Sequence, residues 1–352
     1  MDKQELEAWV KGHGELPVIA GQDFSGLDYQ GIDLGGGLFE HVKFINTNLK
    51  GAVLKECNFI SCDFTGACLD DANLAAANFT DLTAKGVSLK GADLSDTNFI
   101  EAAMDGADLG SARLSGTNFA QTDLTQASFR QSRSENVNFL KCGLKNADFT
   151  DSEHYRPNIL ESDTTGAVFS QAVFTMGFFL KPDLSHQNLS GTTFTQCQFM
   201  EADFSQAELS GMDLTQCGFT GAKLEGADFG GATAKSALFI KSLLKGARFV
   251  GARLDQALFN EADLCQADFT NASLVQAQFT KAVCSGTKFT GADLTYADFS
   301  HADLSGADLS STGLFRTNLH EIIENETTWQ GSTRELALST DEKKAAAEKF
   351  KP

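Results

Sequence analysis

Residues 292–310 read ADLTYADFSHADLSGADLS and show the pattern that fills most of this chain. A Leu or Phe returns every five residues, and a small residue, usually Ala, stands two positions before it. Most residues from 24 to 319 whose numbers end in 4 or 9 are Leu or Phe. Such a repeat overrides the length of 352 residues, which alone would suggest ordinary globular domains.

A second, longer period lies within the first. Counting in steps of 20 from Phe39, every residue is Phe except Ile159 and the last one, Leu319, whereas the other three such series mix Leu with Phe. This clustering indicates that the members of a series are neighbours, each ring stacking on the ring one turn below. Four pentapeptides would then make one coil. About 15 coils at about 4.8 Å each would form a rod of about 70 Å.

The motif A-(D/N)-(L/F)-(S/T)-x, as in ADLSG at 302–306 and ADFTN at 267–271, resembles the pentapeptide-repeat family. The resemblance extends over about 300 residues of the chain. It implies an all-β fold, a right-handed quadrilateral β-helix (a solenoid). With the period of 20 this gives about 15 coils of about 20 residues, and the terminal sequences add short helical or irregular caps. The inward side chains would be the Leu or Phe and the small residue two positions before it.

The repeat degrades around residues 152–166, where His154 and Thr164 take positions that are otherwise apolar. Both periods stay in phase across this segment, and an Asn ladder from Asn58 to Asn158 continues into it, which favours a distorted coil over a linker. The expected domains are an N-terminal cap, helical, at 1–20; a first block of coils at 21–150; a distorted coil or bulged loop at 151–168; a second block at 169–319; and a C-terminal cap with a charged tail at 320–352.

Both ends offer a cap for the open coils. Residues 3–12 predict a short amphipathic helix over the first coil. Ile322, Ile323 and Trp329 are expected to close the last coil, ahead of a charged, Ala-rich segment that reads as a loose helix or tail. Two caps favour a monomer.

The composition limits the cellular setting and the partners. A formal net charge of −19 argues against direct binding of nucleic acid, which needs clustered Lys and Arg. No apolar run of membrane-spanning length and no signal-peptide pattern is present, so we expect a soluble, cytoplasmic bacterial protein, with secretion by a signal-peptide-independent system as the alternative. Most of the eight cysteines replace Ala or Leu in the repeat and read as small buried residues in a reducing compartment.

Motifs for chemistry are not found. The six histidines are scattered without helical metal-ligand spacing, and the chain has no phosphate loop or nucleophile elbow. The outward column of Asp183, Asp203, Asp263 and Asp303 reads as a solvated face, because a convex rod gives no pocket to perturb carboxylate pKa values. We predict no catalytic residue, cofactor or metal, and no enzyme activity.

Nine residues are candidates for an interaction surface. For His154 the alternative interpretation is a displaced loop that puts its side chain in solvent without a function. Phe178, beside a Pro at an Ala position, has the alternative of packing under that loop, and the basic group could simply balance acidic neighbours. The candidates are His154, Tyr155, Arg156, Phe178, Lys235, Lys241, Lys245, Arg248 and Arg253.

Three functions remain open. The first is a non-enzymatic scaffold that binds a protein partner through its surface. The second rests on the resemblance to family members that mimic B-form DNA and bind a type II topoisomerase (gyrase), and the acidic charge is compatible with it. The third rests on a looser similarity to family members that are components or effectors of bacterial secretion systems, including type VI.

Overall fold

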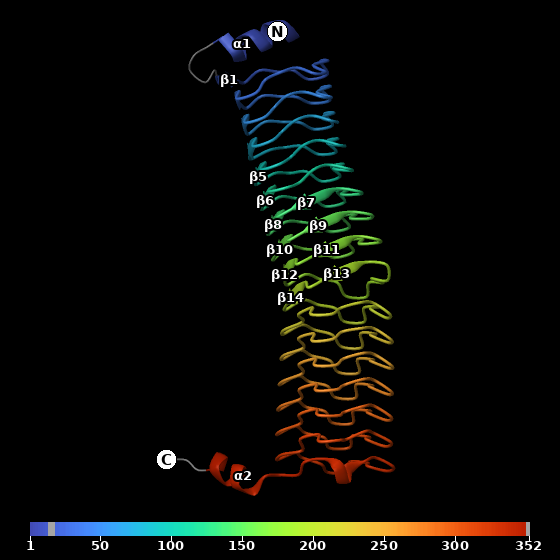
Figure 1. Cartoon of the computed structure of the whole chain (residues 1–352). Coiled ribbons are helices and arrows are strands. Elements are labelled where there is room, and N and C mark those ends of the chain that lie inside the picture. The colour runs from blue at the N-terminus through green and yellow to red at the C-terminus, as the bar shows by residue number, and fades with distance from the viewer. Residues whose placement is uncertain (13–17, 350–352) are drawn as a thin grey trace. The chain divides into compact units, whose positions relative to one another are not determined.

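The computed structural model describes residues 1–12 and 18–349, and these divide into two compact units between Pro182 and Asp183. We call the described residues up to Pro182 unit 1 and those from Asp183 onward unit 2. Each unit is a parallel β-solenoid, and helices occur near the termini (Figure 1). In both units a residue lies beside the one 20 positions further on, and this offset is one turn of the coil. The predicted fold class is confirmed. Neither helix of the described residues has the length and apolar content needed to cross a membrane.

The strands of unit 1 are short, and each pairs in parallel with the equivalent strand of the next turn. In the longer sheet the order is β1, β2, β3, β4, β5, β6, β8, β10, β12, and in the shorter one it is β7, β9, β11. The elements are α1 (Lys3–Gly12), β1 (Val18–Ala20), β2 (Leu38–Glu40), β3 (Asn58–Ile60), β4 (Asn78–Thr80), β5 (Asn98–Ile100), β6 (Asn118–Ala120), β7 (Arg133–Glu135), β8 (Asn138–Leu140), β9 (Glu153–Tyr155), β10 (Asn158–Leu160), β11 (Val173–Thr175) and β12 (Phe178–Leu180).

Unit 2 has fewer regular strands. Beyond Met200 its turns are joined by single parallel bridges, such as Asp203 with Lys223 and Asp263 with Val283, at the same offset as in unit 1. The number of turns that carry strands therefore differs from the predicted coil count, although the predicted period holds. The elements are β13 (Thr193–Thr195), β14 (Gln198–Met200), the 3-10 helix η1 (Arg334–Leu336) and α2 (Glu342–Lys349).

The corners of the coils explain the polar part of the repeat. The residue two positions after the central Leu or Phe has a positive φ, 69° at Gly106 and 57° at Asp71, which is why Gly is frequent there. The Asp or Asn before the central residue accepts a hydrogen bond from the backbone two residues on, as Asp303 Oδ1 does from Ser305 N at 2.9 Å. Each pentapeptide thus carries its own turn.

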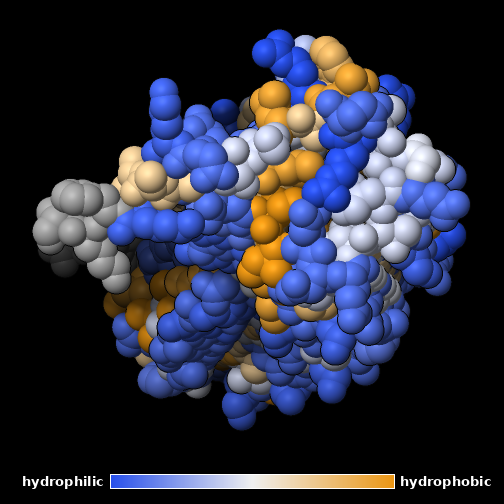
Figure 2. Space-filling model, turned by 90° about the horizontal axis from the view of Figure 1, so that it is seen from below, coloured by the Kyte–Doolittle hydropathy of each residue, from blue (hydrophilic) through white to orange (hydrophobic). Residues whose placement is uncertain are grey.

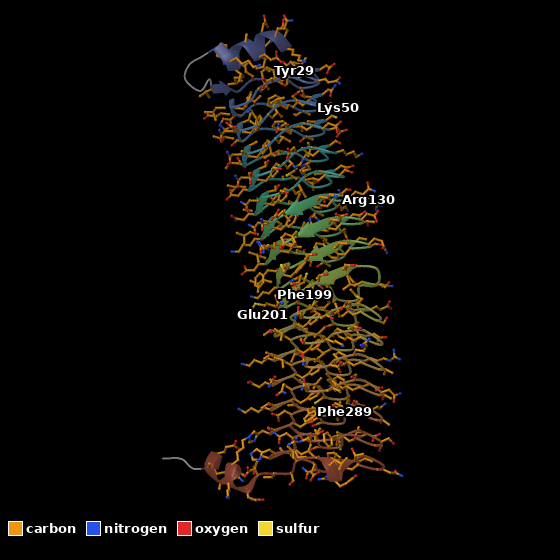
Figure 3. The ribbon with its side chains drawn as sticks, in the orientation of Figure 1. Tyr29, Lys50, Arg130, Phe199, Glu201 and Phe289 are labelled. Carbon is orange, nitrogen blue, oxygen red and sulfur yellow. The ribbon has the colours of Figure 1, made fainter. Side chains whose placement is uncertain are left out.

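The core consists of two inward positions per pentapeptide. Stacked rings run along the solenoid, with centroids 4.8 Å apart for Phe59 and Phe79 in unit 1 and 4.5 Å for Phe279 and Phe299 in unit 2. This stacking confirms that equivalent residues of successive turns are neighbours. Figure 3 shows Phe199 and Phe289 inside the coils, whereas Lys50, Arg130 and Glu201 lie on the outside.

The Asn ladder and the cysteines also behave as predicted. Asn98 Nδ2 donates to Asn78 Oδ1 at 2.9 Å, and Asn138 Nδ2 donates to Asn118 Oδ1 at 2.7 Å. All eight cysteines are free thiols. The buried ones are Cys57, Cys62, Cys142, Cys197, Cys217 and Cys284.

The N-terminal helix is confirmed as α1, Lys3–Gly12, which buries Leu6 and Val10. The hydroxyl of Tyr29 donates to the Met1 carbonyl at 2.9 Å, and Lys11 pairs with Asp33 at 2.8 Å, so that α1 is held on the first coil. Trp9, in contrast, is 42% exposed.

At the C-terminal end the expected closure is wrong for Ile323, which is 50% exposed. Figure 2 shows hydrophobic side chains gathered in a band on the face seen from below, and Leu336 and Leu338 of the last turn are also about half exposed. The charged segment after them forms α2, which buries only Ala345.

Candidate interaction surface

The segment around His154 forms a regular coil. Ser134 on β7 pairs with His154 on β9, and His154 pairs with Phe174 on β11, each one full turn further along, so no residue is inserted. His154 is 3% exposed, and the expectation of a displaced loop with this side chain in solvent is wrong. Its ring stacks on Phe174 with centroids 5.3 Å apart, and its Nδ1 lies 2.7 Å from the hydroxyl oxygen of Ser134. A flat ring with apolar faces and one polar partner can replace Leu or Phe there.

Burial also decides the chemistry of His154. Desolvation lowers the pKa of its imidazole to about 3, so the ring is neutral at physiological pH. Its Nε2 has no hydrogen-bond partner within the described residues. A general base needs a pKa near the working pH, and the pKa of this ring lies far below it. His154 belongs to the core and leaves the candidate surface.

Tyr155 and Arg156 face outward beside it. Tyr155 is 37% exposed, and the guanidinium carbon of Arg156 lies 4.9 Å from the centre of its ring. The hydroxyl of Tyr155 lies 3.6 Å from the sulfur of Met176, a residue one turn further on that is 43% exposed. Met176 was not predicted from the sequence. Because it lies 20 residues after Arg156, the repeat could have placed it beside that residue.

Phe178 completes the group. It lies on β12 directly beside Asn158 of β10 and is half-buried, and Leu160 and Leu180 lie on the same outward side of these strands. Tyr155, Arg156, Met176 and Phe178 come from two consecutive turns where the chain passes from one strand to the next. We call these four residues the Tyr155 patch.

A wide depression of about 1090 Å³ adjoins the patch over strands β7, β9 and β11. Most of its lining residues are polar or charged, with both signs of charge present. Arg113, Arg133 and Glu153 are among them, and Arg133 pairs with Glu153 at 3.3 Å. Tyr155 stands on its border. A partner that covers the patch can therefore meet both an apolar area and a charged area.

The five basic candidates lie on unit 2, and most are paired with carboxylates one turn away. The other two, Lys245 and Arg253, are exposed and have no ion pair within the residues the structure describes. The ion pairs of the first three agree with charge balancing, and exposed pairs of this kind contribute little to stability. The pairs are Lys235 with Asp255 at 3.6 Å, Lys241 with Glu261 at 3.7 Å and Arg248 with Asp228 at 3.0 Å.

The outward Asp column serves the turns. Hydrogen bonds from Ser305 hold the pKa of the Asp303 carboxyl below its usual value. At Asp203 partial burial acts to raise the pKa, but the hydrogen bonds from Ser205 and the charge of Lys223 together outweigh it and lower the pKa. Such carboxylates stay ionised and are poor proton donors at neutral pH.

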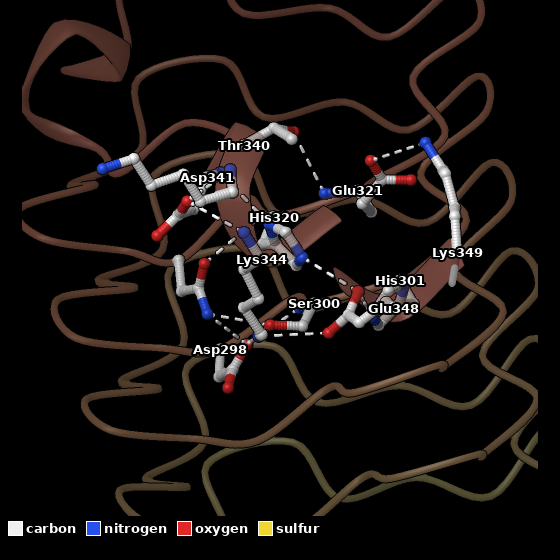
Figure 4. Close-up of polar contacts among 12 residues, drawn as sticks. Asp298, Ser300, His301, His320, Glu321, Thr340, Asp341, Lys344, Glu348 and Lys349 are labelled. Atoms are coloured by element: carbon white, nitrogen blue, oxygen red, sulfur yellow. Dashed lines mark hydrogen bonds and ion pairs between the residues drawn. The ribbon is translucent and has the colours of Figure 1, made fainter. Parts of the chain in front are cut away.

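Two further groups were missed by the sequence analysis. Tyr296 and Phe315, 45% and 46% exposed, meet edge to face at 5.6 Å on unit 2. His301, His320 and Glu348 bring ligand atoms within 4.8 Å of one another beside α2, and they are the one such group found in the described part of the chain (Figure 4). A search for residues about one turn apart would have found the Tyr–Phe pair and the two histidines.

Two sequence families match the chain. "Pentapeptide repeats" matches residues 117–152, 183–216, 272–312 and 282–320, and "Pentapeptide repeat region" matches 32–109 and 212–282. Together these segments cover more than half of the chain. No curated protein matches it at a significant level.

Several solved structures are similar in fold. HetL, a pentapeptide repeat protein involved in heterocyst differentiation regulation from the cyanobacterium Nostoc sp. strain PCC 7120, is 19% identical over 89% of this chain and 91% of its own, with a TM-score of 0.25. QnrB1, a plasmid-mediated fluoroquinolone resistance protein, is 21% identical over 55% of this chain and 96% of its own, with a TM-score of 0.23. Rfr23 from the cyanobacterium Cyanothece 51142 is 19% identical over 33% and 83%, also with a TM-score of 0.23.

Proposed function

The chain belongs to the pentapeptide-repeat family, and we propose that it is a non-enzymatic scaffold that binds a protein partner through the Tyr155 patch. The observation that carries this proposal is the grouping of Tyr, Arg, Met and Phe on a solenoid whose outward positions are mostly small and polar. These residue types are enriched at the centres of protein interfaces, where they supply much of the binding energy.

The fold supports this role because the patch is held in place before binding. Tyr155 and Phe178 sit on strands that are paired on the side of the preceding turn, β9 with β7 and β12 with β10. Side chains on such a framework lose little conformational freedom when a partner binds, so more of the contact energy appears as affinity. Met176 is the adaptable element, since its unbranched side chain can adjust to the partner.

The absence of enzymatic activity is part of the proposal. Its support is that two places that the sequence offered for acid–base chemistry, His154 and the outward Asp column, have structural roles. His154 is neutral and buried beside Ser134, and the outward Asp carboxylates close turns.

The test is capture of partners from the native lysate with immobilised full-length protein, compared with the variants Tyr155→Ala and Met176→Ala. The matched control is Ile100→Ala, because Ile100 is also 37% exposed and lies on unit 1 away from the patch. We expect a specific partner that is lost with either patch variant and kept with the control. Equal capture by all proteins would contradict the proposal. Tyr296→Ala is tested beside them, and loss of the partner with this variant alone would assign the binding surface to unit 2.

A second candidate function, mimicry of DNA toward a type II topoisomerase, is favoured by the net charge of −19. The charge is carried by many exposed carboxylates, as in a row of phosphates, and a field of that sign attracts basic DNA-binding surfaces. The test is gyrase supercoiling with increasing protein. Inhibition that weakens as salt is raised supports mimicry, and unchanged supercoiling at a large excess rules it out.

A further inference from the structure

Three side chains from distant parts of unit 2 meet beside the C-terminal helix (Figure 4). His301 stands at a corner of one turn, with φ 61°, His320 lies about one turn later, and Glu348 comes from α2. The Nε2 atoms of His301 and His320 lie 3.3 and 3.1 Å from the same oxygen, Oε2 of Glu348. The two rings cross at 82° with centroids 5.4 Å apart, so both edges converge on the carboxylate.

We propose that His301, His320 and Glu348 bind a divalent transition-metal ion of the Zn²⁺ type, which fastens α2 to the last turns of unit 2. Two imidazole nitrogens and one carboxylate are a ligand set that Zn²⁺ accepts, at about 2.0 to 2.2 Å from each atom. In a tetrahedron of that size the ligand atoms lie about 3.3 Å apart. Both His–Glu separations already have this length.

The third distance within the tetrahedron joins the ligand nitrogens of the two histidines. It is at most 4.8 Å and has to shorten when the ion binds. His301 can make this movement, because its side chain is 35% exposed and sits at an outer corner. His320 is 2% exposed and acts as the fixed ligand. Since His301 and Glu348 both reach the surface, a water molecule can take the fourth position.

The charge around the site also favours a cation. Glu348 supplies a carboxylate whose Oε2 faces both imidazole rings. Of the two cations at hand, Lys349 is engaged with Glu321 at 3.3 Å, and Lys344 lies 3.7 Å from the other oxygen of Glu348, on an exposed and flexible side chain.

Binding has an identifiable cost. The backbone N–H of Asp341 donates to Nδ1 of His320 at 3.2 Å, so in the metal-free protein the ring proton stands on Nε2 and points to Glu348. A metal needs the Nε2 lone pair, so this proton moves through solvent to Nδ1 and the Asp341 amide turns away. The loss is the hydrogen bond from the Asp341 amide and the one between His320 and Glu348, against three metal–ligand bonds gained.

Such an ion would matter because α2 is otherwise weakly attached. Ala345 is the one buried residue among those of α2, and its other ties are polar contacts at the surface. A metal would join two turns of the solenoid and the helix at one point, and would make attachment of α2 depend on the metal supply.

The first test is titration of the chelator-treated full-length protein with Co²⁺, a spectroscopic probe for this kind of site. We expect one equivalent to give the visible d–d bands of four-coordinate Co²⁺, and Zn²⁺ to remove them. Glu348→Gln and His301→Gln should each weaken binding about tenfold or more. His186→Gln, which changes an exposed histidine away from the site, should bind like the wild type. No Co²⁺ bands, or equal affinity in all these proteins, would overturn the proposal.

The second test reads the attachment of α2 directly. Trypsin cleaves after Lys343, Lys344 and Lys349, and we expect Zn²⁺ to slow this cleavage several-fold in the wild type but not in Glu348→Gln. Glu348 is exposed, so this variant is expected to fold even where a change of the buried His320 would not. Identical cleavage with and without Zn²⁺ in the wild type would show that no ion fastens the helix.

Discussion

At the scale of the residue, His154 shows what the inside of a coil accepts in place of Leu or Phe. The aromatic stack supplies contact on the ring faces, and the Ser134 hydroxyl supplies one hydrogen bond. What the site cannot accommodate is a second proton on the ring, since a buried charge without a counterion is costly. The replacement therefore makes the stability of unit 1 depend on pH.

We expect unit 1 to lose stability in acid through His154. Its folded pKa, about 3, lies below the ordinary value of 6.5, so the stabilisation is complete above about pH 6.5 and is lost as the pH falls toward 3. Between pH 7 and pH 4 the free energy of unfolding should fall by about 3 kcal/mol from this group. Urea unfolding followed by Trp9 fluorescence, with Trp329 replaced by Phe, measures it.

The comparison for this prediction is His154→Phe in the same background. Phe restores the residue type of neighbouring Phe174 and removes the titrating group. The decrease in the free energy of unfolding between pH 7 and pH 4 should therefore be smaller by about 3 kcal/mol. His186→Gln, an exposed histidine in unit 2, should leave the fall unchanged. The same pH dependence in wild type and His154→Phe would contradict the assignment.

The thiols give a second residue-scale prediction. Burial raises the pKa of Cys57 and Cys217 to about 12 and that of Cys62 and Cys142 to about 11, so the reactive thiolate is scarce at pH 8. Iodoacetamide should modify the folded protein only at the partly exposed Cys68 and Cys265, and all eight thiols once it is unfolded. Peptide mass mapping checks this, and early labelling of Cys57 would contradict it.

The sequence predicted residues that obey the repeat and failed for residues that break it. The Phe stack and the Asn ladder were readable because identical residues return once per turn. Both interpretations of His154, as a surface residue and as part of a displaced loop, expected an accessible side chain, because its polarity was weighed without its neighbours. Ser134 one turn away supplies its partner inside the coil. His301 and His320 were dismissed because helical ligand spacing was sought, although in a solenoid residues about one turn apart meet.

At the scale of the element, the corner is the unit that repeats. A backbone with positive φ follows each outward turn, and side chains other than Gly hold this conformation at a cost of about 1 kcal/mol. Asp before and Ser or Thr after the central residue compensate by hydrogen bonding across the turn, as Asp213 does with Thr215. The composition of the pentapeptide follows from this corner.

We expect Gly246→Ala to destabilise unit 2 by about 1 kcal/mol. Gly246 has φ 67° and nothing within 4 Å of an added Cβ, so the cost arises from the backbone alone. Urea unfolding followed by Trp329 fluorescence, with Trp9 replaced by Phe, measures it.

The matched variant is Gly313→Ala in the same unit. Gly313 does not have a positive φ, and an added Cβ would meet its nearest atom at 3.6 Å, an ordinary contact. Its effect should stay within about 0.5 kcal/mol of zero. If both variants lose the same stability, the left-handed corner is not the cause.

The caps were predicted unevenly for a physical reason. Helix α1 was readable because its apolar residues have helical spacing and cover a coil, and Leu6 is fully buried. The C-terminal end was misread at Ile323, because an apolar residue after the last repeat was assumed to be covered. The docking of α2 through Glu348 and Lys349 depends on polar contacts across 28 residues, which no local pattern reveals.

At the scale of the whole molecule, charge and end groups bear on association. A net charge of −19 makes copies of the chain repel one another, and α1 covers the first coil of unit 1. Against this, Ile323, Leu336 and Leu338 expose apolar surface in unit 2. We expect repulsion to prevail and the protein to be a monomer.

Light scattering at low and high salt measures this balance. We expect the mass of one chain at both salt concentrations, because the apolar area of three half-exposed residues is too small for a stable interface. A dimer at high salt that Ile323→Glu returns to a monomer would contradict this expectation and assign the contact to the last turn.

The constant offset between neighbouring turns also limits how such a gene can change length. One turn corresponds to about 60 nucleotides, and a duplication of that size adds a coil while every stacked ring keeps its partner. A duplication of one pentapeptide stays in frame and keeps the local motif, yet it shifts all later residues by a quarter turn and so interrupts the Phe and Asn columns at that point. Changes in length by whole turns therefore preserve the stacking, such as the unbroken Phe series between Phe39 and Phe139.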